Sequence, residues 1–164
     1  MNMDEMLDGM ETASPDPHWS DRHWSDDVVL PALLGAARRP YGAAINEALE
    51  AAGFDDLPRR GSFVIGSVER GGLAMGSLSA AMGMSKQAAS QLVDTLVTRG
   101  YLDRSPDPVD RRRMSVMLTE RGQAAAIEIR AAVARVDAAL TAAVGEAALQ
   151  QARRVLGVLI DLGR

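Results

Sequence analysis

Three consecutive arginines, Arg111, Arg112 and Arg113, form the densest run of positive charge in the sequence. They directly follow the segment SPDPVD, in which prolines and aspartates favour a turn. Guanidinium groups bind phosphates through paired hydrogen bonds, and the negative potential of a narrow DNA minor groove attracts them. This pattern predicts a turn that presents arginines to nucleic acid.

Two aspartates, Asp107 and Asp110, stand in the same turn, although carboxylates repel DNA phosphates. A carboxylate can instead pair with an arginine and hold a turn in one geometry. We expect Asp107 and Asp110 to brace the turn, with Asp110 paired to Arg112 or Arg113 while Arg111 reaches outward. The alternative is an exposed charge cluster on an arbitrary turn.

A second polar set opens the predicted helix 86–99. Gln87 and Gln91 are four residues apart and share one face of that helix. Glutamine can bond adenine, an alanine methyl can touch thymine, and lysine or serine suits phosphate. The residues expected to contact DNA here are Ser85, Lys86, Gln87, Ala88, Ser90 and Gln91. The alternative is a polar surface helix within a helical bundle.

The elements around these residues predict a helix-turn-helix. A short helix over 76–82 is broken by Gly83, and Ser85 stands where the next helix needs an N-cap. Gly100 ends that second helix. Its apolar residues recur at spacings of three and four: Ala89, Leu92, Val93, Leu96 and Val97. A short helix, a glycine turn and a longer helix make the pattern.

After Gly100 the period changes to that of extended chain. The segments 101–104 (YLDR) and 114–118 (MSVML) flank the arginine-bearing turn, so they predict a β-hairpin. A hairpin directly behind a helix-turn-helix is a wing.

Helices are expected on both sides of this unit. Residues 27–52 read as a helix with Asp27 as N-cap, Pro31 near the first turn, and Pro40 ending or kinking it. A short helix is expected over 61–70, although Val64-Ile65 could be strand.

Thr119 is expected to cap a long helix that runs to about residue 144, and a last helix spans 146–162. The apolar stripes of these two helices comprise Ile129, Val133, Val136 and Leu140, then Leu149, Ala152, Val155, Leu156, Leu159 and Ile160. They exceed what a small body can cover, so burial against a second copy of the chain is expected.

Composition limits the function classes. The 164 residues include no cysteine and only two histidines, His18 and His23, so a metal or thiol site in the body is not expected. The body also lacks a glycine-rich phosphate loop and clustered carboxylates, which argues against an enzyme. No apolar run reaches a membrane span, and the acidic N-terminus lacks a signal pattern. We therefore expect a cytoplasmic protein without a cofactor.

The net charge of −4 is unevenly distributed. Residues 1–27 carry eight acidic residues and one basic residue, a net charge of −7, which leaves +3 for the remainder. Residues 1–26 read as an acidic tail in which HWSD occurs at 18–21 and at 23–26. The two copies could form a metal or ligand clamp, or their tryptophans could anchor the tail on the body or on a partner.

At this point the sequence resembles the MarR family of bacterial transcription regulators. Four motifs carry the resemblance in order: GMSKQAASQLVDTL, RGYLDR, DPVDRRR and LTERG. It is close over about residues 60–122 and looser elsewhere. It implies a single domain over 27–164, with dimerisation helices at 27–57 and 119–164 and a winged helix-turn-helix at 58–118.

The resemblance further implies a homodimer that binds pseudo-palindromic double-stranded DNA, with 86–99 as recognition helix and Arg111 or Arg112 in the minor groove. Most such proteins repress transcription, and many release DNA when a small molecule binds between the dimerisation helices and the winged lobe. The fold class expected is therefore mainly α with a small β-hairpin wing. The alternative is a winged-helix architectural or protein-interaction module without an effector.

Overall fold

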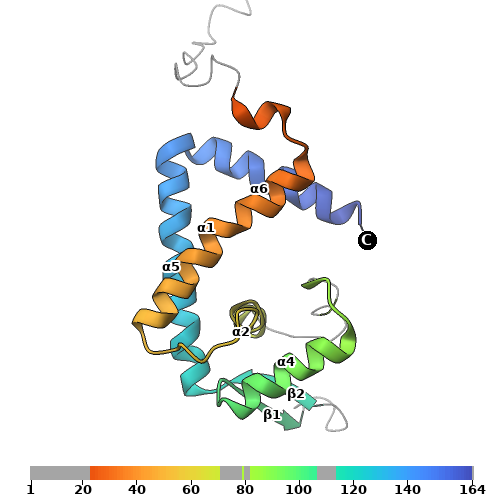
Figure 1. The fold of residues 1–164 in the computed structure, drawn as a ribbon, viewed down its shortest axis with the longest axis vertical. Coiled ribbons are helices and arrows are strands. Elements are labelled where there is room, and N and C mark those ends of the chain that lie inside the picture. Colours follow the sequence, from red (N-terminus) through yellow and green to blue (C-terminus); the bar gives the residue numbers. More distant parts are fainter. Residues whose placement is uncertain (1–22, 71–78, 80–81, 107–113, 164) are drawn as a thin grey trace, which may run out of the picture. The chain divides into compact units, whose positions relative to one another are not determined.

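The structure is a computed structural model that describes residues 23–70, 79, 82–106 and 114–163 (Figure 1). The elements are η3 (Trp24–Asp27), α1 (Leu30–Ala51), α2 (Gly61–Glu69), α4 (Lys86–Thr98), β1 (Leu102–Pro106), β2 (Met114–Leu118), α5 (Glu120–Val144) and α6 (Glu146–Asp161). This confirms a mainly α fold with one antiparallel hairpin. The chain divides into two units, and the boundary lies between Arg38 and Arg39, within α1.

The first long helix begins later than the sequence predicts. Asp27 is not the N-cap of α1, because it ends the short 3-10 turn η3 and α1 begins only at Leu30. The turn has its own capping box, in which the His23 side chain accepts from Ser25 and the Asp26 carboxylate accepts from the His23 N–H. Pro31 does lie in the first turn of α1, where proline is tolerated.

The break expected at Pro40 does not occur. Helix α1 continues through this residue to Ala51. Proline removes one helical hydrogen bond, but Pro40 is exposed, so solvent can satisfy the carbonyl group that loses its partner. The exposure of the site therefore lowers the cost of the lost hydrogen bond.

Helix α2 forms the centre of the winged lobe. Gly61, Val64 and Ile65 are buried, and the helix packs against α5, α4 and β2. The possibility of a strand at Val64-Ile65 is wrong, because these two residues lie in a continuous helix. A helix at this position brings their side chains into the core on one face.

The predicted recognition helix is α4, which lies beside the hairpin (Figure 1). Ala89, Val93 and Leu96 are fully buried, which confirms the inward face expected from their spacing. The helix ends at Thr98, one residue before the expected end, and Gly100 follows with a positive φ of 72°. Of the short helix expected over 76–82, the structure describes only Ser79 and Met82, both helical.

The hairpin is antiparallel, with Leu102 opposite Leu118 and Pro106 opposite Met114. Strand β1 begins one residue later than expected: Tyr101 lies just before it, with its side chain fully buried and its carbonyl group accepting from the Thr119 N–H at 3.2 Å. Tyr101, Leu102 and the buried face of α4 join one hydrophobic core with α2 and α5.

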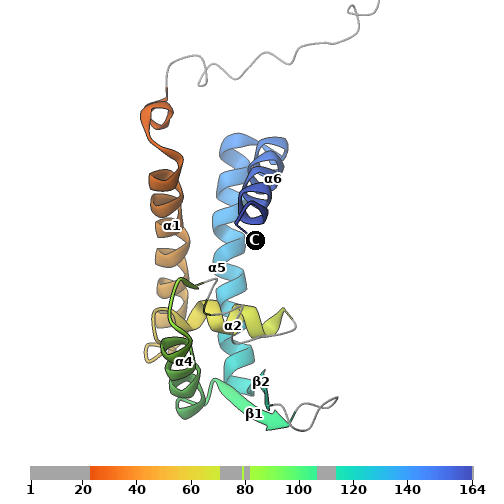
Figure 2. The same cartoon turned by 90° about the vertical axis from the view of Figure 1, so that its right-hand side faces the viewer.

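Thr119 caps α5 as expected: its hydroxyl accepts from the Gly122 N–H at 3.0 Å. The buried residues of α5 lie in its first half and include Ala125, Ala126, Ile129 and Ala132. Toward the other end, Leu140 of the expected stripe is exposed. Helix α6 packs back on α5 (Figure 2). It buries only Leu149.

Candidate nucleic-acid interface

The first two turns of α4 carry residues expected to contact DNA. Lys86, Gln87 and Gln91 are exposed, while Ala88 and Ser90 are half-buried. The buried face of α4 opposes this polar set, so the helix is held by its inner side and offers its outer side. Such a helix fits the major groove of DNA.

Ser85 has a role that limits its use as a DNA contact. Its side-chain oxygen accepts from the Ala88 N–H at 3.1 Å, as an N-cap residue does. The hydroxyl proton remains able to donate to an acceptor such as a phosphate oxygen. The cap also fixes where α4 begins, and hence where Gln87 and Gln91 stand.

The arginines and aspartates of the predicted wing turn, Asp107, Asp110, Arg111, Arg112 and Arg113, lie outside the described residues. The strands on either side of them are described, and the hairpin is paired up to Pro106 and Met114. Ser105 and Ser115 face each other with hydroxyl oxygens 3.3 Å apart.

An ion pair joins the hairpin to α4. The guanidinium of Arg104 on β1 bonds the carboxylate of Asp94 on α4, and both side chains are about half exposed. An exposed pair stabilises the fold only slightly. Its geometric effect is to link the strand leading into the wing directly to the helix.

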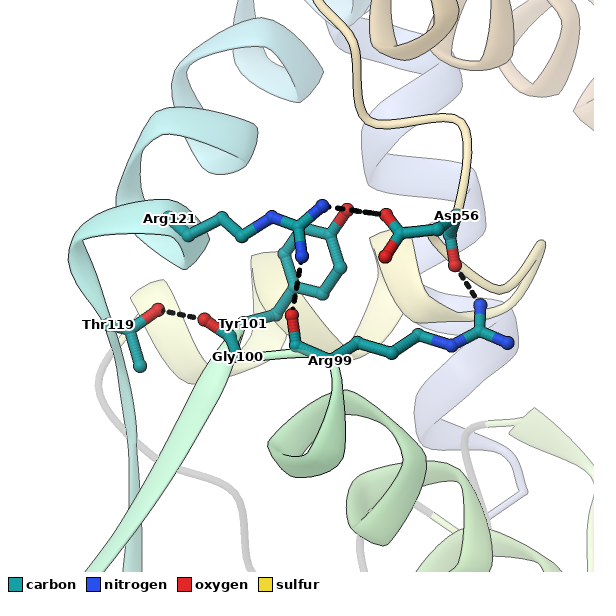
Figure 3. A network of polar contacts seen from close by, with 6 residues as sticks. All are labelled: Asp56, Arg99, Gly100, Tyr101, Thr119 and Arg121. Atoms are coloured by element: carbon teal, nitrogen blue, oxygen red, sulfur yellow. Dashed lines mark hydrogen bonds and ion pairs between the residues drawn. The ribbon is translucent and has the colours of Figure 1, made fainter.

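A polar network lies where α4, β1 and α5 meet (Figure 3). Tyr101 is fully buried, and its hydroxyl donates to the Asp56 carboxylate at 2.5 Å. Arg121 also donates to that carboxylate, at 2.9 Å. The Arg121 guanidinium lies 4.3 Å from the centroid of the Tyr101 ring, in cation–π geometry.

Backbone groups complete the network. Arg121 donates to the carbonyl of Arg99 at 2.6 Å, and Thr119 donates to the carbonyl of Gly100 at 2.6 Å. The Arg99 guanidinium donates to the carbonyl of Asp56. The bonds to Arg99 and Gly100 satisfy carbonyl groups just after α4 that have no partner within the helix.

The network changes the acidity of two of its members. The hydrogen bond from Tyr101 and the charge of Arg121 lower the pKa of Asp56. Burial, together with the hydrogen bond to Asp56, raises the pKa of Tyr101 to about 12. Both groups are therefore held in their ordinary neutral-pH forms, with the carboxylate charged and the phenol neutral.

Sequence reasoning missed this network. Arg121 stands in the LTERG motif and Tyr101 directly follows Gly100, but their types alone do not distinguish a junction from ordinary surface or core. Asp56 is more than forty residues from both arginine partners in the chain, and no periodicity or motif connects it to them.

A second cluster ties α1, α5 and α6 together. The Tyr41 hydroxyl donates to Asp137 at 2.5 Å, and Arg153 donates to the same carboxylate at 2.9 Å. The hydrogen bond to Asp137 raises the pKa of Tyr41. Asp137 is thus the common acceptor for helices from both ends of the chain.

An open groove of about 360 Å³ lies at the end of α1. Its wall combines apolar and charged side chains: Asn46, Leu49, Glu50, Phe54, Asp55, Leu57 and Arg59. The described residues contain no group of three or more potential metal ligands. None of the described helices has both the length and the apolar character to cross a bilayer.

The fold and the exposed polar face of α4 define the class of protein. It is a winged-helix protein with additional helices before and after the winged lobe in the sequence. The profile of the MarR family matches residues 55–113. That range includes α2, α4 and β1.

Three relatives show how far the similarity extends. The transcriptional repressor MprA of Escherichia coli (strain K12) is 31% identical over 77 residues, which cover 47% of this chain and 44% of the repressor. The alignment thus spans less than half of that curated relative.

Solved structures match over a longer range. CouR from Rhodococcus jostii RHA1, bound to p-coumaroyl-CoA, is 26% identical with a TM-score of 0.67, over 85% of this chain and 95% of CouR. A MarR family transcriptional regulator from Silicibacter pomeroyi DSS is 27% identical with a TM-score of 0.65, over 89% and 96%. The chain is thus similar to MarR family regulators, by sequence over its winged lobe and by fold over most of its length.

Proposed function

We propose that the protein is a sequence-specific DNA-binding regulator of transcription that acts as a homodimer in the cytoplasm, and that it is not an enzyme. The observation that carries the proposal is the build of α4. Its inner face is buried, its start is capped by Ser85, and Gln87 and Gln91 are exposed directly in front of a hairpin. A helix held in this way can enter the major groove with its N-terminal residues toward the bases.

The proposed roles follow from side-chain chemistry. Gln87 and Gln91 read base edges, and Ala88 offers a methyl group to thymine. Lys86, Ser85 and Ser90 contact phosphates, which set the register without specifying sequence. In the wing, Arg111, Arg112 and Arg113 supply the positive charge for phosphates or the minor groove, and Asp107 and Asp110 brace the turn.

Dimerisation is supported by the exposed apolar side of α6. Val155, Val158, Leu159 and Leu162 fall within one stripe at spacings of three and four, and all are exposed. Val158 is 62% exposed and Leu162 is 81% exposed. A second copy of the chain would cover this stripe, and a two-fold dimer would match a pseudo-palindromic operator.

We infer that the protein represses transcription and is released from DNA by a small molecule. MprA is a transcriptional repressor, and CouR was solved with bound p-coumaroyl-CoA, so one related protein represses and another binds a small molecule. In this chain the groove beside α1 offers an apolar floor, with Leu49 almost fully buried, and a charged rim at Glu50, Asp55 and Arg59. Such a mixed wall suits a small amphipathic molecule.

Selection of bound genomic fragments by the full chain tests the proposal. We expect a recurrent pseudo-palindromic sequence, protected in footprinting at two half-sites about one helical turn apart. Binding with no sequence preference would favour an architectural module. Failure to bind DNA at any salt concentration would contradict both readings.

A further inference from the structure

Asp56 lies in the loop between α1 and α2, far in sequence from the predicted DNA-reading elements. It nevertheless bonds three residues that lie at the end of α4, just before β1 and in the first turn of α5. Its carboxylate accepts from Tyr101 and Arg121, and its backbone carbonyl accepts from Arg99 (Figure 3). One residue of the loop therefore holds three points of the winged lobe.

The three partners of Asp56 lie at positions that affect the orientation of α4 and of the hairpin. Arg99 is the C-cap of α4. Tyr101 directly precedes β1, and Arg121 lies in the first turn of α5. The end of the proposed recognition helix and the base of the hairpin are thus both joined to one carboxylate-bearing loop.

We propose that Asp56 is a positioning residue for DNA recognition, which sets the end of α4 and the base of the hairpin relative to the loop between α1 and α2. The inference rests on the proposed DNA-binding function. Asp56 itself carries a negative charge and is bonded to its own chain, so it acts through its partners and not on DNA.

The same loop connects this network to the groove. Asp55 and Leu57, the chain neighbours of Asp56, both line the groove, and Phe54 lies on its wall as well. The charge of Asp55 also contributes to the raised pKa of Tyr101. A molecule that displaces this loop would therefore displace Asp56, which gives occupation of the groove a direct route to α4 and the wing.

The main test compares Asp56→Ala with Glu47→Ala in the full chain. Each removes one acidic side chain, but only Asp56 bonds Arg121 and Tyr101, and Glu47 lies in α1 outside the groove. For Asp56→Ala we expect DNA affinity to fall about tenfold, because Tyr101 and Arg121 lose their common acceptor. The slope of log affinity against log salt concentration should stay unchanged, because no phosphate contact is lost. Glu47→Ala should stay within about twofold of the parent protein.

Hydrogen exchange of the free protein supplies a readout that needs no DNA. Asp56→Ala should speed amide exchange at residues 99–104 and 118–122, with the remainder of α5 and α6 unchanged. Asp56→Asn, which keeps an acceptor for the Tyr101 hydroxyl, should give a smaller increase. If Asp56→Ala does not fold, Tyr101→Phe removes the hydroxyl–carboxylate bond alone and is measured in its place.

Unchanged DNA affinity in a folded Asp56→Ala protein would overturn the proposal, as would loss of affinity to the same degree in Glu47→Ala. If the parent protein binds no DNA, the proposed DNA-binding function is rejected. If amide exchange at residues 99–104 still rises in Asp56→Ala, the structural connection between the loop and the winged lobe nevertheless holds. Unchanged exchange together with normal DNA affinity would show that Asp56 positions nothing.

Discussion

The backbone of Gly122 lies so close to the carbonyl group of Tyr101 that a Cβ on residue 122 would overlap that oxygen. The side chain of Leu118 would stand only 3.2 Å from the same Cβ. A glycine in the first turn of α5 thus allows the helix to begin directly against the start of the hairpin. The close approach also leaves Thr119 in reach of the Gly100 carbonyl.

We therefore expect Gly122→Ala to destabilise the protein, although alanine is the better helix former. The added methyl group meets backbone atoms that cannot rotate away, so the cost should reach at least about 2 kcal/mol in the free energy of unfolding. Urea denaturation at fixed protein concentration measures it. Gly66→Ala in α2 is the matched control, because its nearest neighbour, a flexible Arg70 side chain, is 3.5 Å away. That variant should lose no stability, and a loss equal to that of Gly122→Ala would contradict the explanation.

The acidity of Tyr101 predicts a change of stability at high pH. Its pKa is raised to about 12 in the folded protein, above the ordinary value of 10.0, so the neutral phenol stabilises the fold below pH 10 and this contribution is lost as the pH rises toward 12. Tyr41, whose pKa is also raised, adds in the same direction. In a Tyr41→Phe background, tyrosinate absorbance should appear only near pH 12. Tyr101→Phe in that background should make stability fall less steeply between pH 10 and 12, and an unaltered slope would argue against the buried phenol.

The sequence predicts most of the winged lobe because each of its signals is local. Serine and threonine favour the N-cap position directly before a helical pattern, and Ser85 and Thr119 both occupy that position. The spacing of Ala89, Val93 and Leu96 identifies the buried face of α4. The failures have a different origin. Whether Pro40 ends a helix depends on the exposure of that position, which a helical pattern does not reveal.

The residues that line the groove all lie between positions 46 and 59, a stretch in which no motif marks a binding site. The Asp56 network escapes sequence reasoning for another reason: tertiary folding brings its members together, such as Asp56 and Arg121, which are 65 positions apart. No repeat, motif or charge run marks such a pair. The side chains proposed to contact DNA, by contrast, are concentrated in two short segments, and their residue types alone suggest DNA binding.

The wing arginines give a prediction based on salt. Arg111→Ala combined with Arg112→Ala should weaken DNA binding strongly and reduce the slope of log affinity against log salt concentration by about 0.9 for each phosphate contact removed. Filter binding or fluorescence anisotropy over a range of salt concentrations measures both quantities. Unchanged affinity and slope would show that the turn does not meet DNA.

The two glutamines of α4 should affect specificity instead. Gln87→Ala or Gln91→Ala should cost about 1–3 kcal/mol at one base pair of the operator and relax the preference there. Binding to operators changed at single positions locates the effect. Lys86→Ala is the comparison, because loss of a phosphate contact should weaken all sequences alike. If the glutamine variants also lose affinity uniformly, these side chains contact phosphate and not bases.

The apolar stripe of α6 predicts how the proposed dimer responds to an added charge. Val158→Glu places a carboxylate in the centre of a stripe that a second copy of the chain would bury, and an unpaired charge is costly in an apolar interface. We expect sedimentation equilibrium to show monomer, or an unfolded chain, where the parent protein is dimeric, and deletion of residues 145–164 to have the same effect. Gln150→Glu adds the same charge to α6 outside the stripe, so it should leave the dimer intact. A Val158→Glu protein that sediments as a stable dimer would require another surface for dimerisation, and the exposed side of α6 would then need a different partner.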